Sequence, residues 1–345
     1  MAAALTTAVL AGLLLGASPA TASVQPSPAG STHPADAYGF DAPAAAAVAG
    51  GDLFVANNAG NSVTELNASS GAYVATIAGT GYNFNGPTAI KRVKTDIFVT
   101  NGAGDSVTEF VAGTGALVRT ISGAQYGFSD PIALAANSSH LFVLNATGSV
   151  TKLSTTSGHL NSIASGSQFG FDAPTAIISQ GDDLFVTNSS GNSLTEIDST
   201  TMAWVATLSD SSYGFDQPTG IAAHLGNLWV TNEAGQSLTE LSASTGALIQ
   251  VITSDDYYLP TPGPITYGDG YFFAASPPGS SPMITQITAS TASVNWMMCN
   301  TNGPYDFNNP QSLVVAGADL WVVNEGGNSL TEMNARSGKL IATIS

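Results

Sequence analysis

An asparagine recurs at one position of a repeated segment, where its side-chain amide could hold a sugar hydroxyl or a hydrated cation. It follows a short apolar run in six of the seven copies, and the remaining copy has Ser276: Asn57, Asn101, Asn145, Asn188, Asn232 and Asn324. Asparagine also tolerates left-handed backbone and bonds its own backbone two residues on, which suits a strand-ending turn. A site rarely requires the same residue in six places, so we interpret the asparagines first as turn formers. A ring of amides around an entrance is the functional alternative.

Further oxygen donors repeat on either side of these asparagines. They are Asp41, Asn85, Asp172, Asp216 and Asn308 in a YGFD-like tetrad, and Asn61, Asp105 and Asn192 in a later turn. Hard cations such as Ca²⁺ prefer oxygen ligands. No cluster has the dense spacing of a dedicated calcium loop, so we expect no cofactor, with Ca²⁺ or Mg²⁺ as the alternative.

Other side chains that could carry chemistry are dispersed. Glutamate marks the third apolar run of five copies, with Lys152 and Gln286 in the other two: Glu65, Glu109, Glu196, Glu240 and Glu332. Paired carboxylates can do acid–base work, but a blade-to-blade hydrogen bond or a solvated position is the simpler interpretation. His140, His159 and His224 fall in separate turns, and Cys299, the one cysteine, is expected to be a buried thiol.

The elements that position these residues come from the repeat itself, which appears seven times between Tyr38 and Ser345. The proline after the tetrad sets the register, at spacings of 43 to 48 residues: Pro43, Pro87, Pro131, Pro174, Pro218, Pro262 and Pro310. That spacing matches one propeller blade. Each copy holds four short runs rich in Val, Ile, Leu, Thr and aromatics, bounded by turn residues, and each run is typical of a strand.

The four strands of each copy predict an antiparallel sheet that must be covered on both faces, because the second run is apolar without alternation. Stacking seven sheets around an axis covers both faces. We therefore predict an all-β fold, a seven-bladed β-propeller of four-stranded antiparallel blades. Every copy is complete in sequence order, so the ring should close by packing the first blade on the seventh without a borrowed strand.

Composition limits the partners. Hydrophobic residues make up 43% of the chain and charged residues 9%, with a net charge of −17. This scarcity of basic groups argues against nucleic acid, whose binding requires counterions to be displaced. Residues 1–22 resemble a secretory signal peptide, although no Lys or Arg precedes the apolar run, and that run is too short to span a bilayer. Residues 23–37 are predicted to be a flexible leader and 38–345 the propeller. We expect a secreted or cell-surface monomer without a membrane span.

Strand direction places the tetrad loops and the loops after the asparagines on one face of the propeller. The sixth copy departs most from the repeat, with YYLPTP in place of YGFDQP and the longer loop SPPGSSP, and both changes fall on this loop face. Function prefers loops on a rigid scaffold. The predicted contact residues are Tyr257, Tyr258, Pro260, Pro277 and Pro278, with Asn57, Asn101, Asn188, Asn232 and Asn324 as further candidates.

The text FDQPTGIAAHLGNLWVTNEAGQSLTELSASTG resembles an NHL-type or YVTN-like propeller repeat, and the resemblance covers residues 38–345. It implies the propeller fold but not one function, since such propellers include binding modules, lyases and lactone hydrolases. The same group includes the virginiamycin B lyases, which use His and Glu groups with Mg²⁺ on the loop face. No histidine of this chain falls there, so their site is not transferred. Composition suggests a bacterial source.

Two functions follow as hypotheses. The first is a secreted, non-catalytic propeller that binds an extracellular protein or glycan through its loop face. The alternative is a metal-assisted lyase or lactone hydrolase at the channel mouth, for which no catalytic residue is assigned.

Overall fold

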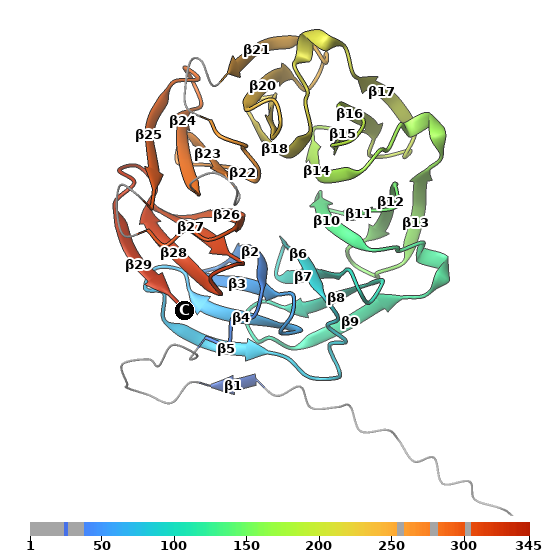
Figure 1. The fold of residues 1–345 in the computed structure, drawn as a ribbon. Coiled ribbons are helices and arrows are strands. Elements are labelled where there is room, and N and C mark those ends of the chain that lie inside the picture. Colours follow the sequence, from blue (N-terminus) through green and yellow to red (C-terminus); the bar gives the residue numbers. More distant parts are fainter. Residues whose placement is uncertain (1–23, 27–37, 254–258, 277–281, 301–304) are drawn as a thin grey trace, which may run out of the picture.

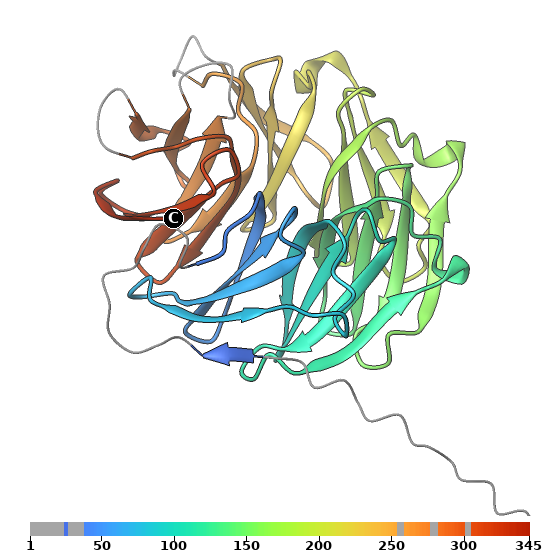
Figure 2. The same cartoon turned by 60° about the horizontal axis from the view of Figure 1, so that its bottom comes forward.

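The chain forms a closed ring of seven antiparallel blades of four strands each, with a fifth, outer strand added to the sheet of blade one, in a computed structural model that describes residues 24–26, 38–253, 259–276, 282–300 and 305–345. Figure 1 looks down the central axis, and Figure 2 shows the same ring tilted. Each blade is continuous in sequence, and blade one lies beside blade seven. The prediction of an all-β, seven-bladed propeller without a borrowed strand is confirmed.

In every blade the first strand is innermost and the fourth is outermost. The first strands are β2 (Pro43–Ala49), β6 (Pro87–Val93), β10 (Pro131–Ala136), β14 (Pro174–Gln180), β18 (Pro218–His224), β22 (Ile265–Gly268) and β26 (Pro310–Ala316). The second strands are β3 (Asp52–Asn57), β7 (Asp96–Asn101), β11 (His140–Asn145), β15 (Asp183–Asn188), β19 (Asn227–Asn232), β23 (Tyr271–Ser276) and β27 (Asp319–Asn324).

The third and fourth strands complete the blades. The third strands are β4 (Ser62–Asn67), β8 (Ser106–Val111), β12 (Ser149–Ser154), β16 (Ser193–Asp198), β20 (Ser237–Ser242), β24 (Met283–Thr288) and β28 (Ser329–Asn334). The fourth strands are β5 (Tyr73–Ile77), β9 (Leu117–Ser122), β13 (Leu160–Ser165), β17 (Trp204–Leu208), β21 (Leu248–Thr253), β25 (Val294–Cys299) and β29 (Leu340–Ile344). Three 3-10 turns, η1 (Ala124–Tyr126), η2 (Ser167–Phe169) and η3 (Ser211–Tyr213), lead into blades three, four and five.

The leading proline begins the innermost strand in six blades, where its missing N–H does not interrupt the ladder. A β-bulge follows at once: in β6 the pairing with β7 passes from Pro87 to Ala89 and skips Thr88. The same skip occurs in the first strands of blades one, three, four, five and seven. A bulge redirects the side chain of the extra residue, and this device shapes the centre of the ring.

The core lies between blades. The second strands are buried along nearly their whole length, and alternate residues pack against opposite neighbours. In β3, Leu53 and Val55 contact the blade seven side while Phe54 contacts the blade two side. The aromatic residues at this position are all buried, as expected for core packing: Phe54, Phe98, Phe142, Phe185, Trp229, Phe273 and Trp321.

Hydrogen bonds between described residues join the first and last blades. The indole Nε1 of Trp321 donates to the carbonyl of Ala68 at 3.2 Å, and the amide of Ala42 donates to Oδ1 of Asn328 at 2.8 Å. Within the segment predicted to be a leader, β1 (Val24–Pro26) pairs antiparallel with β5 at the outer edge of blade one. In the part of the chain that the structure describes, no helix is long and apolar enough to cross a membrane.

Replacing Trp321 with phenylalanine tests the closure. We expect the free energy of unfolding to fall by about 2–4 kcal/mol, because the variant leaves a void and deprives the Ala68 carbonyl of its donor. Trp204 is 46% exposed on β17, so Trp204→Phe is the matched control and should change stability by less than about 0.5 kcal/mol. Urea denaturation measures the free energy of unfolding of both variants, and equal losses in the two would contradict this account of closure.

Candidate functional site

The bulged residues surround the mouth of the central channel. The residue after the leading proline lines this opening in every blade: Ala44, Thr88, Ile132, Thr175, Thr219, Gly263 and Gln311. Together with nearby residues of blades four to seven they enclose a cavity of about 530 Å³. Because the seven blades are arranged in a ring, these equivalent positions surround the same cavity with both polar and apolar groups.

Three threonines hold the rim in place and still face the cavity. The hydroxyl of Thr88 donates to the carbonyl of Pro131 at 2.6 Å, and Thr175 and Thr219 donate to Pro218 and Pro262 at 3.0 and 3.2 Å. Each bond joins one blade to the next. A hydroxyl that has used its proton keeps lone pairs to accept from a ligand, so the rim presents acceptors at fixed positions.

Two carboxylates give the mouth a negative character. Glu233 lines the cavity directly after β19. Glu325 occupies the same place in blade seven, and its Oε2 accepts from Nδ2 of Asn309 at 2.6 Å and from Nε2 of Gln311 at 2.9 Å. The described lining residues include no lysine or arginine. The arrangement suits a ligand that presents hydroxyl or amide donors to these acceptors.

The predicted asparagines lie behind this rim with their side chains fully buried, including Asn57, Asn101, Asn188, Asn232 and Asn324. In blade two, Nδ2 of Asn101 donates to the hydroxyls of Ser106 at 3.1 Å and Thr108 at 3.0 Å, and Thr108 donates to the carbonyl of Tyr82. The same network ties together the second and third strands and the tetrad of blades one, three, four, five and seven. The amides thus form internal bonds behind the rim.

Contrary to the prediction, left-handed backbone is not the reason why the asparagines recur. None of them has a positive φ; the left-handed residues stand four places later, at Asn61, Asp105, Asn192 and Asn328. The amide is required at the strand end because two buried hydroxyls of the third strand need a donor. The left-handed turn that follows is a separate feature of the loop.

The other predicted oxygen donors divide into two groups. Oδ1 of Asn61, Asp105 and Asn192 accepts from a backbone amide of the next blade at 2.7–2.8 Å. The tetrad residues remain exposed on the loop face: Asp41, Asn85, Asp172, Asp216 and Asn308. Among the described residues, no three His, Cys, Asp or Glu side chains come close enough to hold a metal ion.

The histidines lie where the strand directions placed them, away from the channel mouth. His224 ends β18 and stacks on Tyr267 with ring centroids 4.0 Å apart, and His140 begins β11 beside Phe142. Of the predicted blade-six contacts, Pro260 is buried. Tyr257, Tyr258, Pro277 and Pro278 lie outside the described residues. Cys299 is buried, as expected.

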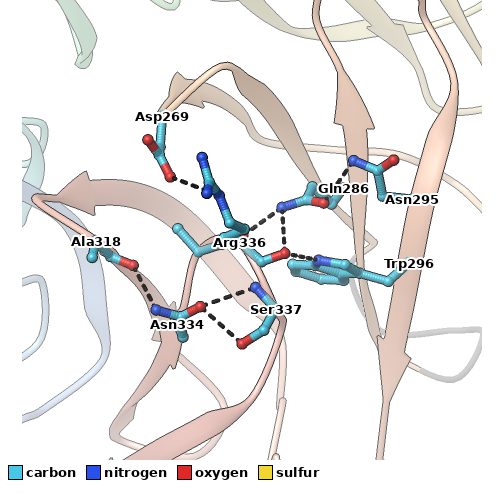
Figure 3. Close-up of polar contacts among 9 residues, drawn as sticks. Asp269, Gln286, Asn295, Trp296, Ala318, Asn334, Arg336 and Ser337 are labelled. Atoms are coloured by element: carbon cyan, nitrogen blue, oxygen red, sulfur yellow. Dashed lines mark hydrogen bonds and ion pairs between the residues drawn. The ribbon is translucent and has the colours of Figure 1, made fainter.

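The third-strand polar column works between blades. Nζ of Lys152 donates to the carbonyl of Thr200 in the next blade at 2.8 Å, and Gln286 Nε2 donates to the carbonyl of Ala335. Figure 3 shows the latter turn, where Trp296 Nε1 also donates to the carbonyl of Arg336 at 3.0 Å. In blade two, Arg119 forms an ion pair with Glu109 at 2.6 Å and donates from Nη2 to the carbonyl of Thr156 at 2.9 Å.

Burial alters the acidity of two glutamates in this column. Desolvation, followed by the nearby charge of Asp52, raises the pKa of Glu65 to about 7. Desolvation and Asp319 likewise raise the pKa of Glu332 to about 7. Glu240 instead accepts hydrogen bonds from Asn227 and Gln250 at 2.8 and 2.6 Å. The column therefore bonds between blades at Lys152 and Gln286 and within one blade at Glu240.

Sequence reasoning did not find the rim. Its signal was present, since the residue after each leading proline varies in type while the proline repeats, and Glu233 and Glu325 stand directly after two of the repeated asparagines. The bulge that redirects the rim residue toward the axis depends on the pairing register. A single strand read along its sequence does not show that register.

Comparisons with known proteins support the fold alone. No protein-family model matches the chain, and no curated protein matches it. Among solved structures, a streptogramin B lyase resembles it with a TM-score of 0.68 and 14% identity, over 83% of this chain and 92% of that one. A Kuenenia stuttgartiensis hydrazine synthase gives 0.61 at 17% identity, over 76% and 87%. The computationally designed Ika8 protein gives 0.59 at 14%, over 88% and 87%. The resemblance to the lyase propeller is thus confirmed for the fold.

The raised pKa values predict that stability decreases as pH rises. Glu65 and Glu332 hold their protons up to about pH 7 when folded, against 4.5 ordinarily, so the folded state binds more protons between these values. The stabilisation is complete below about pH 4.5 and is lost by about pH 7, with an upper limit on the order of 3 kcal/mol per group. Urea denaturation from pH 5 to 8 should show this decline in the wild type and a weaker one in Glu65→Gln/Glu332→Gln. Equal declines in both proteins would refute the assignment.

Proposed function

We propose that this protein is a secreted, non-catalytic binding module that holds an extracellular glycan at the mouth of its channel. One observation carries the proposal: the rim combines hydroxyl acceptors, a carboxylate and a carboxamide with small apolar groups around a cavity of about 530 Å³. Binding pockets typically join apolar walls with a few fixed polar groups. Sugar rings present the complementary surface, with hydroxyls at the edge and C–H groups on the faces.

Rigidity of the rim supports the same function. The bonds from Thr88, Thr175 and Thr219 to the next blade fix the donors and acceptors before a ligand arrives, and a preformed site loses less entropy on binding. In this proposal Tyr257, Tyr258, Pro277 and Pro278, predicted from the sequence as contacts, extend the recognition to a larger glycan or to a protein that bears it. Secretion suits such a partner.

Filling the mouth should abolish binding. Gln311 is exposed at the rim, and Gln311→Trp would place an indole in the cavity. On a glycan array the wild type should retain a defined subset of sugars that Gln311→Trp loses, while thermal melting stays within about 2 °C because the changed side chain is on the surface. The matched control is Gln125→Trp, an exposed glutamine of η1 outside the mouth. Equal retention by all three proteins would exclude the rim as the site.

The alternative is a metal-assisted lyase or lactone hydrolase at the same mouth. Its support is the acidic entrance formed by Glu233 and Glu325, together with the resemblance to the streptogramin B lyase propeller. The residues present do not fit the histidine-containing magnesium site that the resemblance implies, because His140 and His224 occupy strand ends remote from the rim. Glu325 is also engaged by Asn309 and Gln311. No catalytic step is derived through a metal.

Native mass spectrometry of the mature protein before and after chelation separates the two functions. We expect one unchanged mass, because the donor set at the mouth lacks histidine and half of its carboxylate charge is already hydrogen bonded. A stoichiometric divalent ion that chelation removes, and that Glu233→Gln fails to bind, would favour the enzyme and call for a screen of lactones and cyclic esters.

A further inference from the structure

The channel wall carries one distinctive charge. Within their described bounds, the seven innermost strands contain no aspartate or glutamate, one histidine at the end of β18 (His224), and two cationic residues, Lys91 and Arg92, both on β6. Nε of Arg92 donates to the carbonyl of Lys94 at 2.8 Å, which holds it at the turn below the strand. Lys91 forms no hydrogen bond or ion pair with any described residue. It is therefore a cation without an internal partner.

The other blades show that this position does not ordinarily hold a charge. Lys91 pairs with Phe98 of the buried aromatic column. The residues opposite that column in the other blades are small or apolar, apart from one threonine: Ala47, Ala135, Ile178, Ala222, Thr266 and Val314. An ammonium group among them costs desolvation free energy and contributes nothing to the packing that the other six blades achieve without it.

Its surroundings direct Lys91 into the channel. One edge of β6 pairs with β7, and Ile90 and Val93 on the same strand are buried between blades. The Lys91 side chain is nevertheless exposed. Because β6 is the innermost strand of blade two, that exposure places the side chain at the central channel. The protein around the channel lowers the pKa of the Lys91 ammonium group through desolvation. Exposure together with a lowered pKa is expected of a side chain that contacts solvent inside a channel.

The rim and the lysine lie at different depths on one strand. Lys91 follows Thr88 by three residues, a rise of about 10 Å along β6, and the flexible four-carbon stem of lysine covers part of that length. A ligand whose hydroxyls contact the rim would therefore bring a group at its deeper end within reach of the ammonium group. Because Glu233 and Glu325 stand at the entrance of a protein with net charge −17, free small anions are disfavoured unless other contacts hold them.

We propose that the channel recognises a uronic acid, a sugar whose hydroxyls bind the rim and whose carboxylate pairs with Lys91 below it. This inference rests on the glycan-binding function proposed above and adds the charge of the sugar to it. The carboxylate would supply the counter-charge that no described residue gives to Lys91. A charge-assisted hydrogen bond inside an enclosed channel is stronger than the same bond at the surface.

Reductive methylation with ¹³C-formaldehyde gives a direct test, because dimethyl-lysine keeps its positive charge and the chain has four lysines: Lys91, Lys94, Lys152 and Lys339. The Lys91 signal, identified by its absence in Lys91→Met, should shift in a saturable way with glucuronate and much less with glucose or acetate. Calorimetry should show glucuronate affinity reduced roughly tenfold or more in Lys91→Met, through loss of the charge-assisted bond. Lys94→Met, an exposed turn lysine, is the matched control and should bind as the wild type does.

The outcomes distinguish the two proposals. If glucose and glucuronate bind with equal affinity, and Lys91→Met leaves both affinities unchanged, the uronic acid proposal is overturned. The glycan site would then stand as long as Gln311→Trp blocks the binding. Absence of binding by either sugar would overturn both proposals. A glucuronate shift at Lys94 or Lys152 of the same size as at Lys91 would show a non-specific charge effect and also overturn the assignment.

Discussion

The structure depends on second strands that are apolar on both faces. Leu53 and Phe54 point to opposite neighbours and are both fully buried, so a blade cannot satisfy its own sheet and needs another blade on each side. An open stack would leave two apolar faces in water, at a cost of about 25 cal/mol for each Å² exposed. Closing the ring removes both faces at once. The contacts of Trp321 with Ala68 and of Asn328 with Ala42 then fix where the closure falls.

Closure also explains where polar groups are tolerated. The third strands of six blades carry a buried polar residue at one shared position, and its counterpart in blade four, Glu196, is half-buried. Lys152 and Gln286 donate directly to a carbonyl of the next blade, whereas Arg119 reaches a carbonyl and pairs with Glu109. Glu65 and Glu332 are acids at this position, and burial raises the pKa of each to about 7. A neutral carboxyl can donate to a carbonyl, and a carboxylate cannot.

The fold could be predicted almost entirely from sequence, because every element is repeated and each copy repeats the same local signals. Prolines, turns and apolar runs gave the blade boundaries, the strand order and the phase of closure. The rim could not be predicted in this way. Thr88 and Gln311 face the channel because the ladder skips one residue after the proline, and a bulge is a property of two paired strands. Asn101 was predicted to be a turn former, with an entrance as the alternative, whereas its buried amide bonds the hydroxyls of the third strand.

Repetition itself separates the roles of residues in this molecule. A side chain that recurs at one position of most blades has a structural role that every blade shares, as the asparagines do when they bond the hydroxyls of the third strand. A side chain that differs from those at the equivalent position of the other blades, while the backbone register is unchanged, has no such shared role. Gln311, Glu233, Glu325 and Lys91 are departures of this kind, and they lie on or beside the same central opening. Seven-fold packing could accommodate alanine or threonine at each of their positions, so packing does not account for these polar and charged side chains, and the ligand that we propose is the partner they would have in common.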